Sequence, residues 1–202
     1  KNGTDLMSIT THMTKSDTID AMFFRYSTDN GQTWSSPEKK QVYQKTERGT
    51  RRSWIKMAFV ANEKLVFLLN KALLPGDDPL EGLKNWTIWY AISEDGGKSI
   101  TREEQIIQKE PAFDNRNPLP GIITGKNCYM IGDKTQVPII KDGKILVPIQ
   151  TTPLGPDGEY YNPGGGYTFH DSAVLIGSWN EKGDIQWQLS EKIKGDPQKS
   201  TR

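Results

Sequence analysis

Few side chains in this sequence combine the type and spacing that catalysis or ion binding requires. His170 and Asp171 are adjacent, and a carboxylate can orient a neighbouring imidazole as a general base. Because no serine or cysteine nucleophile motif accompanies them, a structural hydrogen bond is the favoured interpretation. Arg48, Arg51 and Arg52 form a small basic cluster, and planar guanidinium groups suit the binding of carboxylates. The alternative is a set of arginines on a solvated face.

The residue pattern predicts no metal site and no cofactor. The two histidines, His12 and His170, are too few for a typical histidine-rich zinc site. The acidic turns at 76–78 and 156–158 lack the spacing of a calcium-binding loop. The run Gly164–Gly166 lacks the lysine and hydroxyl residue of a phosphate-binding P-loop, so a flexible loop is expected there.

Length, charge and cysteine content narrow the class of protein. The 202 residues suffice for one sizeable core or two small ones. The 26 basic and 25 acidic side chains give a net charge of +1, which argues against a nucleic-acid or membrane-surface binder. No apolar run approaches the roughly 20 residues of a membrane span. A single cysteine, Cys128, excludes an intrachain disulfide and is expected to be a small buried apolar side chain.

Short β-strand signals dominate the chain that must position these residues. Apolar or β-branched runs cover 21–26, 64–69, 86–92, 137–140, 145–149, 173–177 and 185–189. Between two of these runs, Asp142-Gly143 is a strong hairpin signal. We therefore expect an all-β chain of short antiparallel strands. The long loops at 73–84, 111–125 and 151–166 are expected to form a ligand-facing end, with plain surface insertions as the alternative.

The most constrained motif is residues 27–34, which read S-x-D-x-G-x-T-W, the Asp-box pattern. Gly31 suits a tight turn with positive φ. Asp29 can accept hydrogen bonds from the N–H groups of the turn, and the hydroxyls of Ser27 and Thr33 can assist. Trp34 is expected to pack beneath the turn and close it. The motif predicts a structural hairpin tip.

The Asp box recurs in weaker form. Residues 93–100 follow the template, with Ser99 in place of Thr and Ile100 in place of Trp as the apolar plug. Residues 178–187 form a more degenerate third copy. The intervals fit one propeller blade of roughly 40–50 residues plus long loops, and three independent hairpins in a sandwich are the alternative. The positions of the second copy that match the template are Ser93, Asp95 and Gly97.

These features resemble the sialidase (neuraminidase) superfamily, whose members are six-bladed β-propellers with Asp boxes (BNR repeats). The resemblance rests on residues 25–34, the box at Ser93 and the segment 135–148, and it covers most of the chain. The tail at 174–190 and 200–202 looks like a bacterial sialidase-like branch. It implies that residues 1–202 are one partial β-propeller domain holding roughly the first three blades. Since a propeller hides its sheet edges by closing, the missing blades are expected from the rest of the protein or from another chain.

The resemblance also implies a mechanism. Retaining exo-sialidases grip the substrate carboxylate with three arginines, and a tyrosine activated by a glutamate attacks the anomeric carbon. An aspartate acts as general acid and then as base. By position, Asp17 is the best match for this aspartate and Asp20 the runner-up, while a solvated loop carboxylate is the alternative for either. No Arg-Ile-Pro-type motif lies in 1–26, and the glutamate, the next arginine and the tyrosine cannot be placed in this chain.

For an acidic sugar, the candidate binding residues are Arg48, Arg51 and Arg52, with Trp54 as a stacking plate, together with Tyr160 and Tyr161. The expected function is a sialidase-like glycoside hydrolase of the exo-α-sialidase type, with a glycan as its substrate. A non-catalytic Asp-box propeller that binds carbohydrate or protein is the alternative, and another carbohydrate-active enzyme on this fold is the third possibility. No signal peptide is visible and the chain begins at Lys1, so the residues leave the location open, while the resemblance implies a secreted or periplasmic protein.

Overall fold

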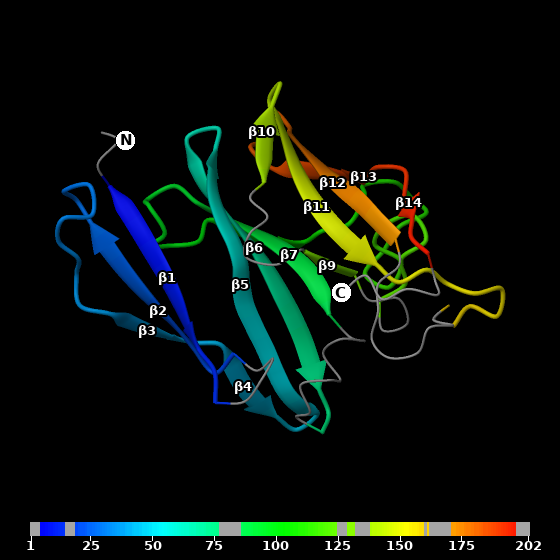
Figure 1. Cartoon of the computed structure of the whole chain (residues 1–202), viewed down its shortest axis with the longest axis horizontal. Coiled ribbons are helices and arrows are strands. Elements are labelled where there is room, and N and C mark those ends of the chain that lie inside the picture. The colour runs from blue at the N-terminus through cyan, green and yellow to red at the C-terminus, as the bar shows by residue number, and fades with distance from the viewer. Residues whose placement is uncertain are drawn as a thin grey trace.

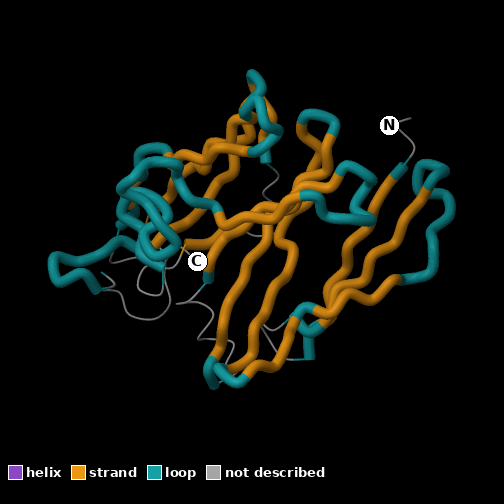
Figure 2. Tube along the Cα trace, turned by 180° about the vertical axis from the view of Figure 1, so that it is seen from behind, coloured by secondary structure: helices purple, strands orange, loops and turns teal. Residues whose placement is uncertain are grey.

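The computed structural model describes residues 5–14, 19–76, 86–124, 129–131, 138–159, 161 and 171–196. Within them the protein forms strands and no helix, arranged as three antiparallel sheets, none of which closes on itself (Figures 1 and 2). The all-β expectation is therefore confirmed. Consequently, the described residues include no helix that could cross a membrane.

The first sheet is a meander of β1 (Leu6–His12), β2 (Ala21–Ser27) and β3 (Glu38–Gln41) in chain order. Strand β2 was expected from its apolar run. Its side chains Met22 and Phe24 are buried, and Met7 and Ile9 of β1 pack against the neighbouring sheet. This short meander therefore contributes one apolar face to a shared core.

The second sheet has the order β4 (Tyr43–Thr46), β5 (Gly49–Ala61), β6 (Lys64–Leu74), β7 (Thr87–Ser93) and β8 (Arg102–Gln105). Strand β6 is flanked by β5 and β7, and its residues Val66, Phe67 and Leu68 are almost fully buried. Burial on both faces explains its unbroken apolar run. The second sheet therefore lies between the other two (Figure 1).

The third sheet has the order β10 (Ile139–Lys141), β11 (Lys144–Thr151), β12 (Asp171–Trp179) and β13 (Ile185–Leu189). Two short strands join it: β9 (Tyr129–Ile131) pairs with β11, and β14 (Ile193–Lys194) pairs with β12. The predicted hairpin is confirmed, because Asp142 and Gly143 have φ of 51° and 72° between paired Lys141 and Lys144.

The main core fills the space between the second and third sheets. Leu68, Ile88 and Tyr90 of the second sheet meet Leu175 and Trp187 of the third, and the rings of Tyr90 and Trp187 lie 5.8 Å apart. Side chains along β11 alternate between this core and the other face of the sheet, as expected for a half-buried strand.

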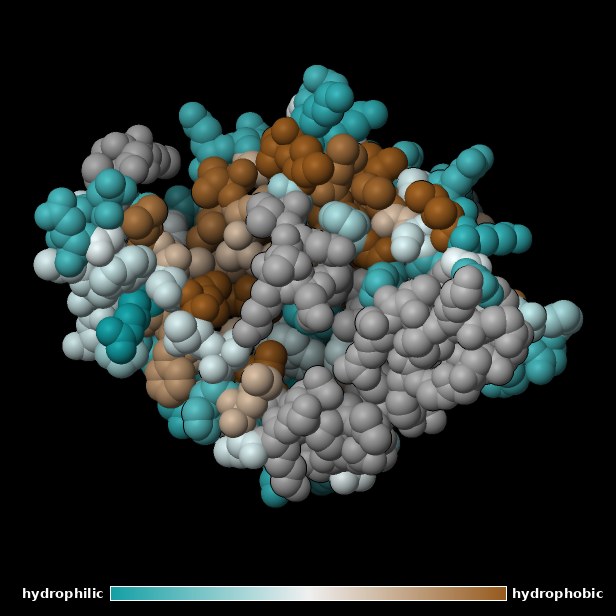
Figure 3. Space-filling view, in the orientation of Figure 1, coloured by the Kyte–Doolittle hydropathy of each residue, from teal (hydrophilic) through white to brown (hydrophobic). Residues whose placement is uncertain are grey.

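The other face of the third sheet also carries apolar side chains. We call this the free face. Its apolar side chains on β11 and β12 are half-buried, and Figure 3 shows apolar side chains gathered over the region of β10–β12. Facing pairs in the strand register place the members on one side of the sheet: Ile139, Leu146, Pro148, Val174 and Ile176.

Candidate functional site

The first Asp box forms the turn between β2 and β3. The Ser27 hydroxyl donates to Asp29 Oδ1 at 2.7 Å and accepts from the Gly31 N–H at 2.8 Å. The Thr33 N–H donates to Asp29 Oδ1 at 2.9 Å, and its hydroxyl donates to Oδ2 at 2.5 Å. Gly31 has φ of 85°, as its role in a tight turn requires. The hydrogen bonds from Thr33, then those from Ser27, lower the pKa of Asp29 to about 2.

The second Asp box repeats this turn between β7 and β8. The Ser93 hydroxyl donates to Asp95 Oδ1 and accepts from the Gly97 N–H, both at 2.8 Å. The Ser99 N–H and hydroxyl bind the two oxygens of Asp95 at 2.9 and 2.6 Å. The hydrogen bond from the Ser99 hydroxyl, followed by that from its N–H, moves the pKa of Asp95 well below its ordinary range. Both carboxylates therefore hold a turn and stay ionised.

The apolar closing residues of the boxes are less buried than expected. The Trp34 indole donates to the Gly31 carbonyl at 3.0 Å, which folds it over the turn, but 40% of the residue stays exposed. Ile100 is 49% exposed, so the expectation that it plugs its turn is wrong. The turn is closed by hydrogen bonds, and these side chains add only partial packing.

The third copy lies at the same kind of junction, between β12 and β13, but is built differently. Asn180 Oδ1 accepts from the N–H groups of Lys182 and Asp184, both at 3.0 Å. The glycine with positive φ is Gly183, three residues after Asn180, whereas Gly31 and Gly97 come two residues after their aspartates. An amide side chain thus replaces the carboxylate as the acceptor of the turn.

Contacts between the sheets bring these three turns to one end of the molecule, the box end. The Tyr26 hydroxyl donates to the Gly97 carbonyl at 3.3 Å, joining the first two turns. Arg102 Nε lies 2.7 Å from Asp184 Oδ1, joining the second and third. The opposite ends of the strands, the loop end, receive the connections that follow β1, β3, β6, β8 and β11. The predicted catalytic and binding residues that the structure describes belong to the loop end: Asp20, Arg48, Arg51, Arg52 and Tyr161.

Asp20 and Arg52 meet at the loop end. Asp20 Oδ2 accepts from the N–H and the hydroxyl of Thr14, both at 2.7 Å. Arg52 Nη1 donates to the Ile19 carbonyl at 3.1 Å, lies 3.7 Å from Asp20 Oδ1, and its guanidinium stands 5.5 Å from the ring centre of Tyr43. Burial opposes ionisation of Asp20, but the hydrogen bonds from Thr14 and the charge of Arg52 together lower its pKa.

A lowered pKa means that Asp20 is ionised at neutral pH and has no proton to donate as a general acid.

The preferred candidate, Asp17, and also Tyr160, Cys128 and His170 lie outside the described residues. Tyr161 lies on the connection after β11, is 46% exposed, and donates its N–H to the Pro153 carbonyl at 3.0 Å. Sequence reasoning missed Thr14 and Tyr43, which stand six and nine residues from the groups they contact, because no motif marks either spacing.

The arginine cluster divides in the folded chain. Because neighbouring residues of β5 point to opposite faces, Arg52 is buried while Arg51 is exposed, and Arg48 is exposed in the turn between β4 and β5. Trp54 is buried and makes an edge-on contact with Trp86 at 5.5 Å, so the expectation of a stacking plate for a sugar is wrong. An anionic ligand at this end would meet Arg51 and Arg48.

The described residues contain no group of three or more His, Cys, Asp or Glu side chains that could hold a metal ion. No protein-family model matches the chain, and no curated protein matches it significantly.

Proposed function

We propose that this chain is part of a sialidase-like glycoside hydrolase of the exo-α-sialidase type, which removes terminal acidic sugars from glycans with retention. The observation that carries the proposal is the Asp-box turn, which occurs twice with the same hydrogen bonds at the same strand junction. Each box joins the last two strands of an antiparallel meander. The second and third sheets each contain four consecutive antiparallel strands, β5–β8 and β10–β13, with β4 added to the second and β9 and β14 to the third. This repetition is what a sialidase-type propeller of radially arranged blades requires.

The free face of the third sheet supports the same architecture. The buried face of this sheet already packs against the second sheet, and the second sheet also packs against the first. A sheet with apolar side chains on both faces fits a position between two neighbours. A further blade over Leu146, Val174 and Ile176 would continue the series, whether it came from the same protein or another chain.

In this proposal the loop end binds the glycan. Asp17 remains the first candidate for the acid/base, and the exposed guanidinium groups of Arg48 and Arg51 bind the sugar carboxylate. Arg52 is buried beneath this surface and does not contact the sugar, because its guanidinium is bound to Asp20 and the Ile19 carbonyl. The tyrosine nucleophile and its glutamate would come from the blades that complete the ring.

The test is turnover of a fluorogenic sialoside by the longest natural polypeptide that contains these residues. Asp17→Asn is compared with Glu181→Gln, which removes an exposed carboxylate at the box end. We expect Asp17→Asn to lose about 10²–10⁴-fold in kcat, as for a general acid, and Glu181→Gln to lose nothing. Absence of turnover by the unaltered protein would refute the proposed enzymatic activity. Equal rates for Asp17→Asn and the unaltered protein would show that Asp17 is not the acid/base.

The second candidate is a non-catalytic propeller that binds carbohydrate or protein. One observation favours it: the runner-up acid, Asp20, is ionised and paired with Arg52, an arrangement suited to holding a loop rather than to transferring a proton. Binding of a sialoside without turnover by the unaltered protein would select this function.

A further inference from the structure

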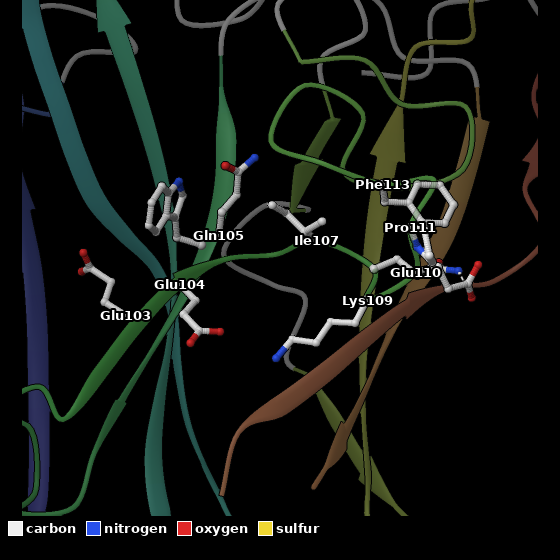
Figure 4. A pocket seen from close by; sticks show the side chains of 10 residues that line it. Glu103, Glu104, Gln105, Ile107, Lys109, Glu110, Pro111 and Phe113 are labelled. Carbon is white, nitrogen blue, oxygen red and sulfur yellow. Dashed lines mark hydrogen bonds between the residues drawn. The ribbon is translucent and has the colours of Figure 1, made fainter. Parts of the chain in front are cut away.

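A hollow of about 610 Å³ opens beside β8 and the segment that follows it. Figure 4 shows Glu103, Glu104 and Gln105 on one side, Pro111 and Phe113 on the other, and Ile107 between them. The volume falls within the range of about 300–1,000 Å³ that is usual for small-ligand sites. None of the residues predicted from the sequence to bind or react lines it.

The wall after β8 is held in place by hydrogen bonds. Gln105 Nε2 donates to the Asn115 carbonyl at 3.3 Å, and the Gln108 N–H donates to the Pro118 carbonyl at 2.9 Å. The Phe113 N–H donates to the Glu110 carbonyl at 3.0 Å. A wall fixed before binding reduces the entropy lost when a ligand is ordered there.

The lining alternates apolar surface with hydrogen-bonding groups. Trp89, Ile107 and Phe113 supply apolar surface, and the Trp89 indole is fixed by donating to Thr87 Oγ1 at 2.9 Å. Amide, carboxylate and ammonium groups stand beside them on Gln105, Gln108, Glu110 and Lys109. A sugar ring has the matching character, because one face is largely C–H and its rim carries hydroxyls that both donate and accept.

Charge decides which sugar fits. Glu103 is paired with Lys71, and Glu104 accepts from Arg102 at 2.7 Å and from the Tyr90 hydroxyl at 3.0 Å. Lys71 balances Glu103, whereas Arg102 is shared between Glu104 and Asp184, so these carboxylates exceed their cations by one charge. The remaining charged groups of the lining, Lys109 and Glu110, have opposite signs. A lining with a slight excess of negative charge gives no advantage to an anionic ligand.

The same strand is poorly suited to pair with another polypeptide. Strand β8 has only four residues, and three of them, Arg102, Glu103 and Glu104, are charged. Short, charged edge strands are a usual protection against the addition of a further strand. An extended peptide is thus a weaker candidate than a compact ligand.

We propose that this hollow is a binding site for a neutral saccharide, of the size of one or two pyranose rings. The site rests on the lining of the hollow alone and does not depend on the proposed hydrolysis at the loop end. It would hold a neutral part of a glycan while acidic sugars are recognised elsewhere.

The experiment is saturation-transfer NMR of the protein with lactose as the neutral probe and a methyl sialoside as the anionic one. Phe113→Ala and Lys109→Ala remove one apolar and one polar group of the lining. Val60→Ala, at a side chain that is 66% exposed outside the lining, is the control. Circular dichroism of each variant reports folding, and the exposed Lys109→Ala remains informative if Phe113→Ala does not fold.

We expect lactose to bind with a Kd of about 1–10 mM. The methyl sialoside, whose proposed site is at the loop end, should bind equally well to the lining variants and to the unaltered protein. Each lining variant should weaken lactose binding by about 5–10-fold, and Val60→Ala should leave it unchanged. The proposal is overturned if lactose shows no transfer at about 50 mM, if both lining variants bind it like the unaltered protein, or if a lysine-containing peptide binds the hollow more tightly than lactose.

Discussion

Two neighbouring glycines of the second Asp box allow a test of how the first and second sheets pack. Gly96 and Gly97 both have positive φ, of 76° and 93°. A methyl group on Gly96 would meet nothing within 4 Å. A methyl group on Gly97 would lie 2.8 Å from Met7 Sδ of the first sheet, 3.2 Å from Leu65 and 3.4 Å from Phe67. The two sites therefore share the conformational strain and differ in crowding.

The expected magnitudes follow from that difference. Either alanine costs about 1–2 kcal/mol for the left-handed backbone. Crowding adds about 1–3 kcal/mol at Gly97 only, at the lower end if the flexible Met7 thioether moves aside. Gly97→Ala should thus lower the free energy of unfolding by about 2–5 kcal/mol, and Gly96→Ala by about 1–2 kcal/mol.

Urea unfolding followed by tryptophan fluorescence measures the free energy of unfolding of both glycine variants under identical conditions. A third variant, Met7→Ala combined with Gly97→Ala, tests the contact between residue 97 and the Met7 thioether. Removing the thioether should recover part of the crowding energy, since the two sites share one space. Equal destabilisation by the two glycine variants, with no recovery on removing Met7, would show that the first sheet does not pack on this turn.

Three further outcomes are expected. The folded pKa of Asp29, about 2, is below its ordinary value of 3.8, so the stability that Asp29 provides is complete above about pH 4 and is lost as the pH falls towards 2. Asp29→Asn should therefore make the melting temperature depend less on pH between about 4 and 2. An unchanged dependence of the melting temperature on pH would contradict this. Leu175→Ala, in the core between the second and third sheets, should cost about 2–5 kcal/mol in urea unfolding, whereas Leu73→Ala, at a side chain 38% exposed, should cost under about 1 kcal/mol. Arg52→Ala should lower stability by about 1–3 kcal/mol, since it removes the hydrogen bond from a buried guanidinium to the Ile19 carbonyl. Arg51→Ala should leave stability unchanged and weaken sialoside binding, and the reverse pattern would refute the division of the arginine cluster.

Features set by a few neighbouring residues could be predicted from the sequence. The Asp142-Gly143 hairpin and the first Asp box depend on hydrogen bonds and φ angles within one turn, and both occur as expected. The second box also keeps its turn despite two substitutions. The burial of the closing side chains could not be predicted in this way, because it depends on what the rest of the chain places beside the turn.

Strand β5 shows where sequence reasoning failed. Its start carries Arg51 and Arg52, so no apolar or β-branched run marks it as a strand, although Thr50, Arg52 and Trp54 alternate as buried residues. A β-bulge between Ile55 and Met57 then shifts the alternation by one residue and hides the period. The pairing of Arg52 with Asp20 joins segments far apart in the chain, and no local pattern reports such a contact.

Strand β6 has a consequence for the dynamics of the protein. It is hydrogen-bonded along both edges and covered on both faces, so its amide groups reach solvent only if β5 or β7 separates from it, which opens the core on both faces. Its amide protons should exchange with deuterium only when the whole molecule unfolds. The amides of β1, at one edge of the first sheet, should exchange through local fraying. Protection against hydrogen exchange should therefore be lost first in the edge strands and last in β6.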